Sequence, residues 1–180
     1  VADGVPLRLT GQAAARGTFS QRHLTFFDAR TGAPFTPLTA LPDQRASFDV
    51  HNSPLSENAA LGFEYGYSVQ APDTLVLWEG QYGDFINGAQ VIVDEFVTSA
   101  RATWGQTPSL VMPLPHGYEG QGPDHSSARA ERSLRLAAAL HMRNANPPTA
   151  PPYFHTHRPQ APPAPAPPPA PVAPTPPRPA

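Results

Sequence analysis

The sequence predicts an α/β domain in which helices cover both faces of a parallel sheet, followed by a disordered tail rich in proline and alanine. Short apolar runs alternate with segments in which apolar residues recur every three or four positions, in the order strand, helix, strand, helix. Strands that are separated by helices pair in parallel. The 180 residues suffice for one domain of ordinary size, and we expect it to occupy residues 1–146.

The middle of the chain contains the first strand and helices of this prediction. Residues 75–78 (LVLW) form an apolar run after a turn-prone segment, which is typical of a strand buried on both faces. A helix is expected from Phe85 onward, because apolar residues recur there at helical spacing and Asp84 can cap the free amides. Residues 56–68 predict another helix, although their aromatic residues and glycines favour helix poorly.

The next two elements repeat the alternation. Residues 109–114 (SLVMPL) predict a second buried strand. Residues 126–141 predict a helix, because leucines and alanines recur at helical spacing and Glu131 lies four positions before Arg135. Together the four elements require crossover connections, which place helices against the faces of the sheet.

The tail, residues 147–180, has a composition that predicts no core. It contains 16 of the 26 prolines and no acidic residue, so polyproline II or disorder is expected. The tail is interpreted as a linker to a further domain, as a ligand for proline-binding modules, or as a frameshifted segment. A frameshift is favoured because arginine is the only basic residue besides histidine, as a GC-rich gene would encode.

Composition excludes several classes of protein. The chain contains no cysteine, which excludes disulfide scaffolds, thiolate nucleophiles and cysteine-ligated metal centres. Its formal net charge of -2 argues against a nucleic-acid partner. No apolar run approaches the roughly 20 residues that span a bilayer, so no membrane partner is expected, and Val1 begins no signal peptide. We expect a chain whose beginning is missing.

Residues 116–127 (HGYEGQGPDHSS) form the first candidate site. They follow a predicted strand and precede a predicted helix, which is where open parallel sheets bind ligands. Glycines let a backbone approach a ligand, and His116 and His125 can donate hydrogen bonds. The pattern favours an anionic substrate. The alternatives are a structural turn with solvated histidines, or a metal site that lacks a second set of ligands.

Other candidate residues stand before this loop. Glu57 and Glu64 are seven residues apart in a largely apolar segment, so both would lie on nearly one face of a helix. A buried carboxylate needs a partner, and one of the two could face a cofactor, whereas a surface position is the ordinary alternative. An aromatic residue near Phe85 could stack on a flat ring or could belong to the core.

Four segments together resemble one family: RGTFSQRH (16–23), NSPLSENAALGFEYGYS (52–68), LVLWEGQYGDFINGAQVIVDEF (75–96) and LPHGYEGQGPDHSSARAER (114–132). They resemble the thiamine-diphosphate-dependent decarboxylase component of 2-oxoglutarate dehydrogenase. The resemblance covers about residues 5–135 and implies the pyrimidine-binding domain, with a transketolase-like fold, of a longer enzyme. That enzyme performs oxidative decarboxylation of 2-oxoglutarate and passes a succinyl group to lipoamide, in the tricarboxylic acid cycle.

The resemblance assigns roles to individual residues. It implies that Glu57 hydrogen-bonds the aminopyrimidine ring of thiamine diphosphate and so promotes loss of the thiazolium C2 proton. Phe85 is implied to pack on the same ring, with Tyr82 the less favoured candidate. His125 is implied to face the 2-oxo acid with His116 as its neighbour, and Glu64 then has a structural role.

The resemblance also implies what lies outside this chain. The strings that hold magnesium and the diphosphate in this superfamily are absent, so they are expected in another domain, usually across the boundary of a homodimer. A lipoyl domain of the succinyltransferase component is the implied partner, and the bacterial cytoplasm is the implied location. Alanines replace the usual acid at residues 13–15, and Asn58 replaces the usual aromatic residue. The isolated chain is expected to be inactive; a non-catalytic interaction protein that presents its proline-rich tail is the alternative.

Overall fold

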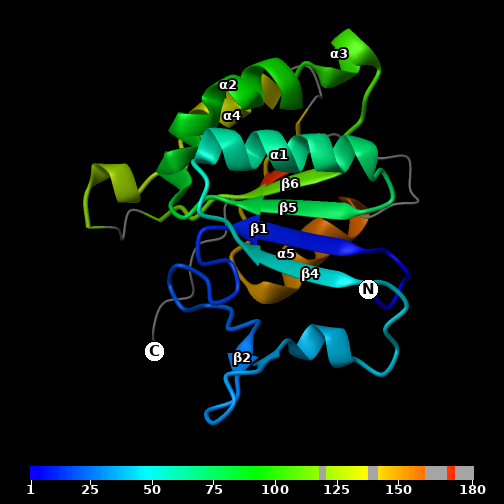
Figure 1. Ribbon diagram of the computed structural model, residues 1–180. Helices are drawn as coiled ribbons and strands as arrows, with labels where there is room; N and C mark the ends of the chain where they lie inside the picture. The colour runs from blue at the N-terminus through cyan, green and yellow to red at the C-terminus, as the bar shows by residue number, and fades with distance from the viewer. Residues whose placement is uncertain (118–120, 138–141, 161–169, 173–180) are drawn as a thin grey trace.

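In the computed structural model, residues 1–117, 121–137, 142–160 and 170–172 are described. Within them, five parallel strands form one sheet in the order β4-β1-β5-β6-β7 (Figure 1). The strands are β1 (Leu7–Gly11), β4 (Phe48–Asn52), β5 (Leu75–Glu79), β6 (Leu110–Pro113) and β7 (Ala170–Val172). The order confirms the predicted parallel sheet, with the two strands predicted from apolar runs at its centre.

Strand β5 shows why the sheet needs cover on both faces. All its residues are buried, and they alternate between two hydrophobic clusters. Val76 and Trp78 point into the cluster beneath α1, whereas Leu75 and Leu77 point into the cluster on the opposite face. The continuous apolar run therefore reflects a central strand between two layers of helix.

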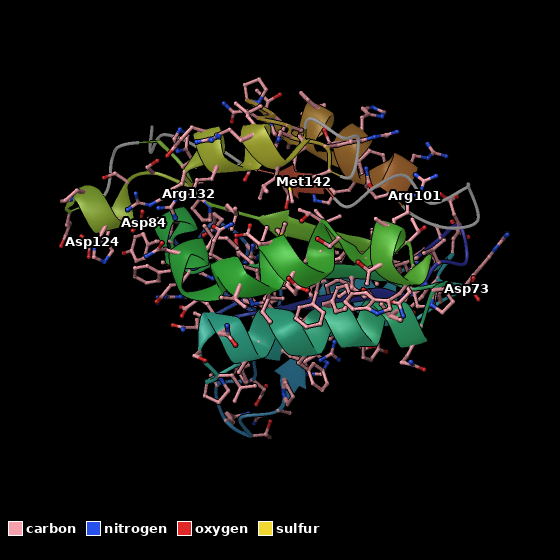
Figure 2. The ribbon with its side chains drawn as sticks, turned by 90° about the horizontal axis from the view of Figure 1, so that it is seen from above. Asp73, Asp84, Arg101, Asp124, Arg132 and Met142 are labelled. Carbon is pink, nitrogen blue, oxygen red and sulfur yellow. The ribbon has the colours of Figure 1, made fainter. Side chains whose placement is uncertain are left out.

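Helix α1 (Glu57–Gln70) lies on the first face, and α5 (Ala150–His157) lies on the other (Figures 1 and 2). Ser56 caps α1, because its hydroxyl accepts a hydrogen bond from the amide of Ala59 at 3.4 Å. The helix buries Leu61 and Tyr65 against the sheet despite the glycines of this segment. Burial of an apolar face therefore outweighs the weak intrinsic preference for helix.

The prediction of one continuous helix from Phe85 is wrong, because the segment is divided into four short helical elements. The segment contains η2 (Gly83–Ala89), the short helix α2 (Gln90–Ile92), the π-helical turn η3 (Val93–Val97) and α3 (Ala100–Trp104). Asn87 and Gly88 are poor helix formers. The hydroxyls of Thr98 and Ser99 donate to the carbonyl of Asp94 at 2.9 and 2.8 Å, which competes with the regular helical ladder.

The helix predicted over residues 126–141 begins later. The structure has η4 (Pro123–His125) and then α4 (Ala130–Leu136). Arg129 has a φ of 51°, so the backbone is left-handed immediately before α4 and the helix cannot start earlier. Residues 138–141 of the predicted helix lie outside the described residues.

The prediction of disorder from residue 147 is wrong for residues 170–172, which form β7, and residues 161–169 and 173–180 of the predicted tail lie outside the described residues. The prediction is also wrong for residues 150–160. They form α5 (Ala150–His157) and η6 (Arg158–Gln160) on the second face of the sheet. Prolines stand in the first turn of α5, where their missing N–H groups are not needed. Tyr153 packs on the second hydrophobic cluster, and Ser109 donates a hydrogen bond to the carbonyl of Gln160 at 3.0 Å.

A small antiparallel hairpin, β2 (Phe26–Phe27) and β3 (Pro34–Phe35), lies beyond the sheet edge and is followed by η1 (Pro37–Ala40). Its three phenylalanines are exposed. No helix in the described part of the chain is long and apolar enough to cross a membrane.

Candidate functional site

The segments that follow the parallel strands meet at the carboxyl edge of the sheet. Figure 2 shows Asp84 and Asp124 together at this end, whereas Asp73, which precedes β5, lies at the other end. The first turn of α1, η2 and η4 also reach this edge, because they follow β4, β5 and β6. The four sequence-predicted residues Glu57, Phe85, His116 and His125 therefore lie at the carboxyl edge of the sheet.

Glu57 is the first residue of α1 and is half-buried. Its Oε1 accepts a hydrogen bond from Nε2 of Gln12, the residue that directly follows β1, at 3.3 Å. Its Oε2 lies 3.6 Å from the position that a Cβ on Gly88 would take. A small cavity beside the carboxylate is lined by Gly11, Gln12, Ser53, Leu55, Glu57, Ala60, Trp78, Glu79 and Gln81.

Phe85 and His125 belong to an aromatic cluster with Tyr82. The ring centroids of Tyr82 and His125 are 4.3 Å apart and nearly perpendicular, and those of Phe85 and His125 are 5.5 Å apart. Phe19, from the loop after β1, meets Tyr82 edge-on at 5.5 Å. Because Phe85 and Gly88 both lie in η2, this element extends from the aromatic cluster to the Glu57 carboxylate.

The imidazole of His125 is held mainly by these ring contacts. Its Nδ1 is buried and lies 3.0 Å from Oδ1 of Asp124, but the two groups form no hydrogen bond. Asp124 is itself largely exposed. The ring can therefore be oriented by Tyr82 and Phe85, while a third of the histidine side chain is open to solvent.

His116 lies apart from this cluster. Its Nδ1 accepts a hydrogen bond from the amide of Ala128 at 2.9 Å, so in the neutral imidazole the proton is on Nε2. It lines a cavity of about 250 Å³ with Leu114, Ala128, Ala130, Ser133, Leu134, Asn144, Ala145 and Asn146. The hydrogen bond connects His116 to the segment just before α4.

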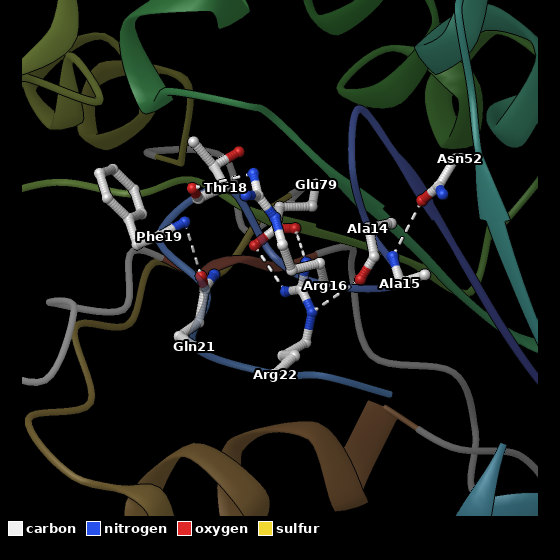
Figure 3. A network of polar contacts seen from close by, with 9 residues as sticks. All are labelled: Ala14, Ala15, Arg16, Thr18, Phe19, Gln21, Arg22, Asn52 and Glu79. Carbon is white, nitrogen blue, oxygen red and sulfur yellow. Dashed lines mark hydrogen bonds and ion pairs between the residues drawn. The ribbon is translucent and has the colours of Figure 1, made fainter. Parts of the chain in front are cut away.

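A buried ion pair that the sequence did not single out borders the same edge. Both oxygens of Glu79, which is 3% exposed, accept from Arg22, and Arg22 also donates to the carbonyl of Ala14 at 3.1 Å (Figure 3). Tyr153 packs nearby, and its burial, with the charge of Glu79 as a lesser cause, raises its pKa to about 12. The pair fixes the loop after β1 to the end of β5.

A sequence signal for this pair exists. Glu79 ends the apolar run of β5, and a carboxylate in that position needs a cation. The segment RGTFSQRH supplies arginines, but the sequence does not indicate which of them reaches Glu79, 57 residues away.

A second missed contact fixes η2. Asp84 is buried and accepts from Nε of Arg129 at 2.5 Å, instead of capping a helix as the sequence predicts. A Cβ on Gly83 would lie 2.7 Å from the Cβ of Ala128 and also against the carbonyl of Pro115. η2 and the segment before α4 therefore approach closely, which holds Phe85 near η4.

Glu64 has the structural role expected for it. It is 1% exposed and accepts from Nε and Nη2 of Arg8 on β1, at 2.8 and 3.0 Å. The guanidinium also lies over the rings of Phe63 and Tyr67, and its contact with Glu64 raises the pKa of Arg8. The second acid of α1 therefore ties the helix to the sheet.

Comparisons with known proteins show which family the chain is similar to. The chain is 62% identical over 159 residues to the 2-oxoglutarate dehydrogenase E1 component of Geobacillus sp. (strain WCH70). It is 60% identical to the protein of the same name from Bacillus subtilis (strain 168), and 58% identical to that from Oceanobacillus iheyensis. Each match covers 88% of this chain but only 17% of the length of the relative.

The family match extends further than residues 5–135, over which the sequence motifs indicate it. The family described as "Transketolase, pyrimidine binding domain" matches residues 1–167, which include α5. On that match the chain belongs to the transketolase pyrimidine-binding domain family.

Proposed function

We propose that this chain forms the part of a 2-oxoglutarate dehydrogenase thiamine component that binds the aminopyrimidine ring of thiamine diphosphate. The proposed reaction is oxidative decarboxylation of 2-oxoglutarate with succinyl transfer to lipoamide, in the tricarboxylic acid cycle of a bacterial cytoplasm. The single observation on which the proposal rests is the Glu57 carboxylate at the start of α1, beside η2 with its half-buried Phe85. The names of the bacterial relatives support the same reaction.

The residues at this edge fit the ring chemically. A carboxylate can accept a hydrogen bond from a protonated ring nitrogen, and the protonated carboxyl group can give its proton to the unprotonated nitrogen. One face of Phe85 can cover a flat heterocycle. Gly88 has no side chain next to Glu57, so the approach to Oε2 from η2 is unobstructed by a side chain at that position.

Thiamine diphosphate, when bound, supplies an acidic carbon that adds to a 2-oxo acid and accepts the electrons left by loss of carbon dioxide. In this proposal Glu57 holds or releases a proton at its Oε2, while Phe85 orients the ring. His125 faces the 2-oxo acid, because its partly exposed imidazole lies against Phe85 and can donate a hydrogen bond to a carboxylate. His116 supports the loop of His125 from the start of α4.

Other parts of the proposed enzyme come from outside this chain. The described residues contain no group of three or more histidine, aspartate or glutamate side chains that could hold a metal ion. We propose that magnesium and the diphosphate are bound by another domain of a longer polypeptide, in a homodimer, and that a lipoyl domain receives the product. Isolated, this chain would then be inactive.

The test is Glu57→Gln in the full-length enzyme, with the exposed Glu95→Gln as the matched control. The amide keeps the size of the side chain but cannot hold a proton in the same way. Exchange of the cofactor C2 hydrogen, followed by NMR, should slow by about a hundredfold or more in Glu57→Gln and stay unchanged in Glu95→Gln. Thermal unfolding should be the same in both variants. Normal C2 exchange in Glu57→Gln would defeat the proposal.

A further inference from the structure

We infer that Gln12 is a positioning residue for Glu57, and that Gly88 keeps the second carboxylate oxygen accessible. This inference rests on the proposed function and extends it to a residue that directs which oxygen of Glu57 meets the ring. In this inference Gln12 acts through its hydrogen bond to Glu57.

The position of Gln12 is set by the sheet. Gln12 follows Gly11, the last residue of β1, where a Cβ would lie 2.6 Å from the carbonyl oxygen of Glu79. This close approach of β1 to β5 requires glycine. The backbone of residue 12 is therefore held in place by the pairing of β1 with β5 immediately before it.

The start of α1 is tied to the same point. The carbonyl of Gly11 accepts a hydrogen bond from the amide of Ser53 at 2.9 Å, and the side chain of Asn52 accepts one from the amide of Ala15 at 2.9 Å. Figure 3 shows the second of these contacts. The first bond joins the end of β1 to the segment before α1, and the second joins the loop after β1 to the side chain of the last residue of β4. Together they restrain the separation of residue 12 and residue 57.

The two oxygens of Glu57 have different surroundings. Oε1 accepts from Nε2 of Gln12 at 3.3 Å, whereas Oε2 faces the position 3.6 Å away where Gly88 has no side chain. An amide donates a hydrogen bond but does not give up its proton at neutral pH. Gln12 therefore keeps Oε1 occupied as an acceptor and leaves Oε2 as the oxygen that exchanges a proton with the ring.

The test compares Gln12→Met, which removes the donor and keeps the length of the side chain, with Gln70→Met, the same change at the exposed end of α1. In the full-length enzyme, Gln12→Met should slow C2 exchange and kcat between about tenfold and a hundredfold, because the carboxylate loses its fixed orientation. The KM for 2-oxoglutarate should not change, since Gln12 does not contact the 2-oxo acid. Gln70→Met should match the unsubstituted enzyme.

Two further variants make the outcome independent of a folding defect. Gly88→Ala places a methyl group in ordinary contact with Oε2, so it should weaken binding of thiamine diphosphate to the apoenzyme by about tenfold. Quenching of the fluorescence of Trp78, which lines the same cavity, measures that affinity without turnover. In Glu57→Gln with Gln12→Met, the second change should have no further effect on C2 exchange.

The outcomes separate this inference from the proposed function. If Glu57→Gln exchanges C2 normally, the proposed function fails. If Glu57→Gln is slow but Gln12→Met lies within about twofold of the unsubstituted enzyme, only the role of Gln12 is overturned. A crystal structure of the Gln12→Met apoenzyme should show the Glu57 carboxylate displaced, and an unchanged carboxylate would also overturn that role.

Discussion

Replacing Arg8 by methionine should destabilise the chain by about 3 kcal/mol, because it leaves a buried carboxylate without its cation. Glu64 is 1% exposed, and both of its oxygens accept from Arg8, at 2.8 and 3.0 Å. Removal of one partner from a buried ion pair costs about 3–5 kcal/mol. The side chain of Arg8 is 15% exposed, so water can reach part of the vacated position, which places the loss at the lower end of that range.

Urea unfolding of the 180-residue chain, followed by tryptophan fluorescence, to which the buried Trp78 and the exposed Trp104 both contribute, and by circular dichroism, measures the loss. Arg45→Met, which replaces an exposed arginine, should change the free energy of unfolding by less than about 0.5 kcal/mol. Glu64→Met combined with Arg8→Met should recover most of the stability, because an apolar pair needs no charge compensation. If Arg8→Met alone unfolds like Arg45→Met, the reasoning about Glu64 is refuted.

Two predictions concern other contacts. Gly83→Ala should lower the free energy of unfolding by about 1–3 kcal/mol, because its methyl group would press on the carbonyl of Pro115. Gly66→Ala, with open space around it on α1, should raise the free energy of unfolding by about 0.5–1 kcal/mol. The urea midpoints of the two variants should therefore shift in opposite directions, and equal shifts would contradict the packing. Burial lowers the pKa of His157 below its ordinary value of 6.5, so protonation of the imidazole favours the form in which α5 is undocked from the sheet. The packing of α5 that is present above pH 6.5 should therefore weaken as the pH falls from about 7.5 to about 5. Amide hydrogen exchange of α5 checks this, and the same weakening in His157→Gln would contradict it.

Strands β5 and β6 could be predicted from the sequence, whereas β1 and β4, on the other side of β5, could not. Strands β5 and β6 are buried on both faces and therefore read as apolar runs. Strand β4 lies at an edge, and its exposed Asp49, His51 and Asn52 hide the pattern. Strand β1 contains Arg8, whose charge is neutralised by a residue 56 positions away.

Composition gave a wrong prediction for part of the tail, because it averages over the whole segment and does not show where individual residues lie. Proline content predicts disorder when no large side chain can be buried. Residues 150–160 nevertheless include Tyr153 and His157, which pack toward the sheet, and their prolines stand where a helix tolerates them. The position of a proline within a helix, and the presence of one aromatic anchor, decided the outcome over these residues.

The candidate site was predicted in part. The four predicted residues lie at the carboxyl edge of the sheet, as expected for segments that follow parallel strands. Gln12 and Glu79 were missed because their partners, Glu57 and Arg22, are 45 and 57 residues away in the chain. Pairings across such separations depend on strand order, which local patterns do not specify.

Helix α1 holds two carboxylates that lie two turns apart and face different surroundings. Glu64 is anchored to Arg8 on β1, so α1 can neither turn about its own axis nor slide along the sheet without breaking two hydrogen bonds. The direction in which Glu57 leaves the helix axis is therefore set by the contact of Glu64, about 10 Å away along the helix. Substitutions at Arg8 or Glu64 can for this reason alter chemistry at the first turn of α1 while leaving every residue of that turn intact.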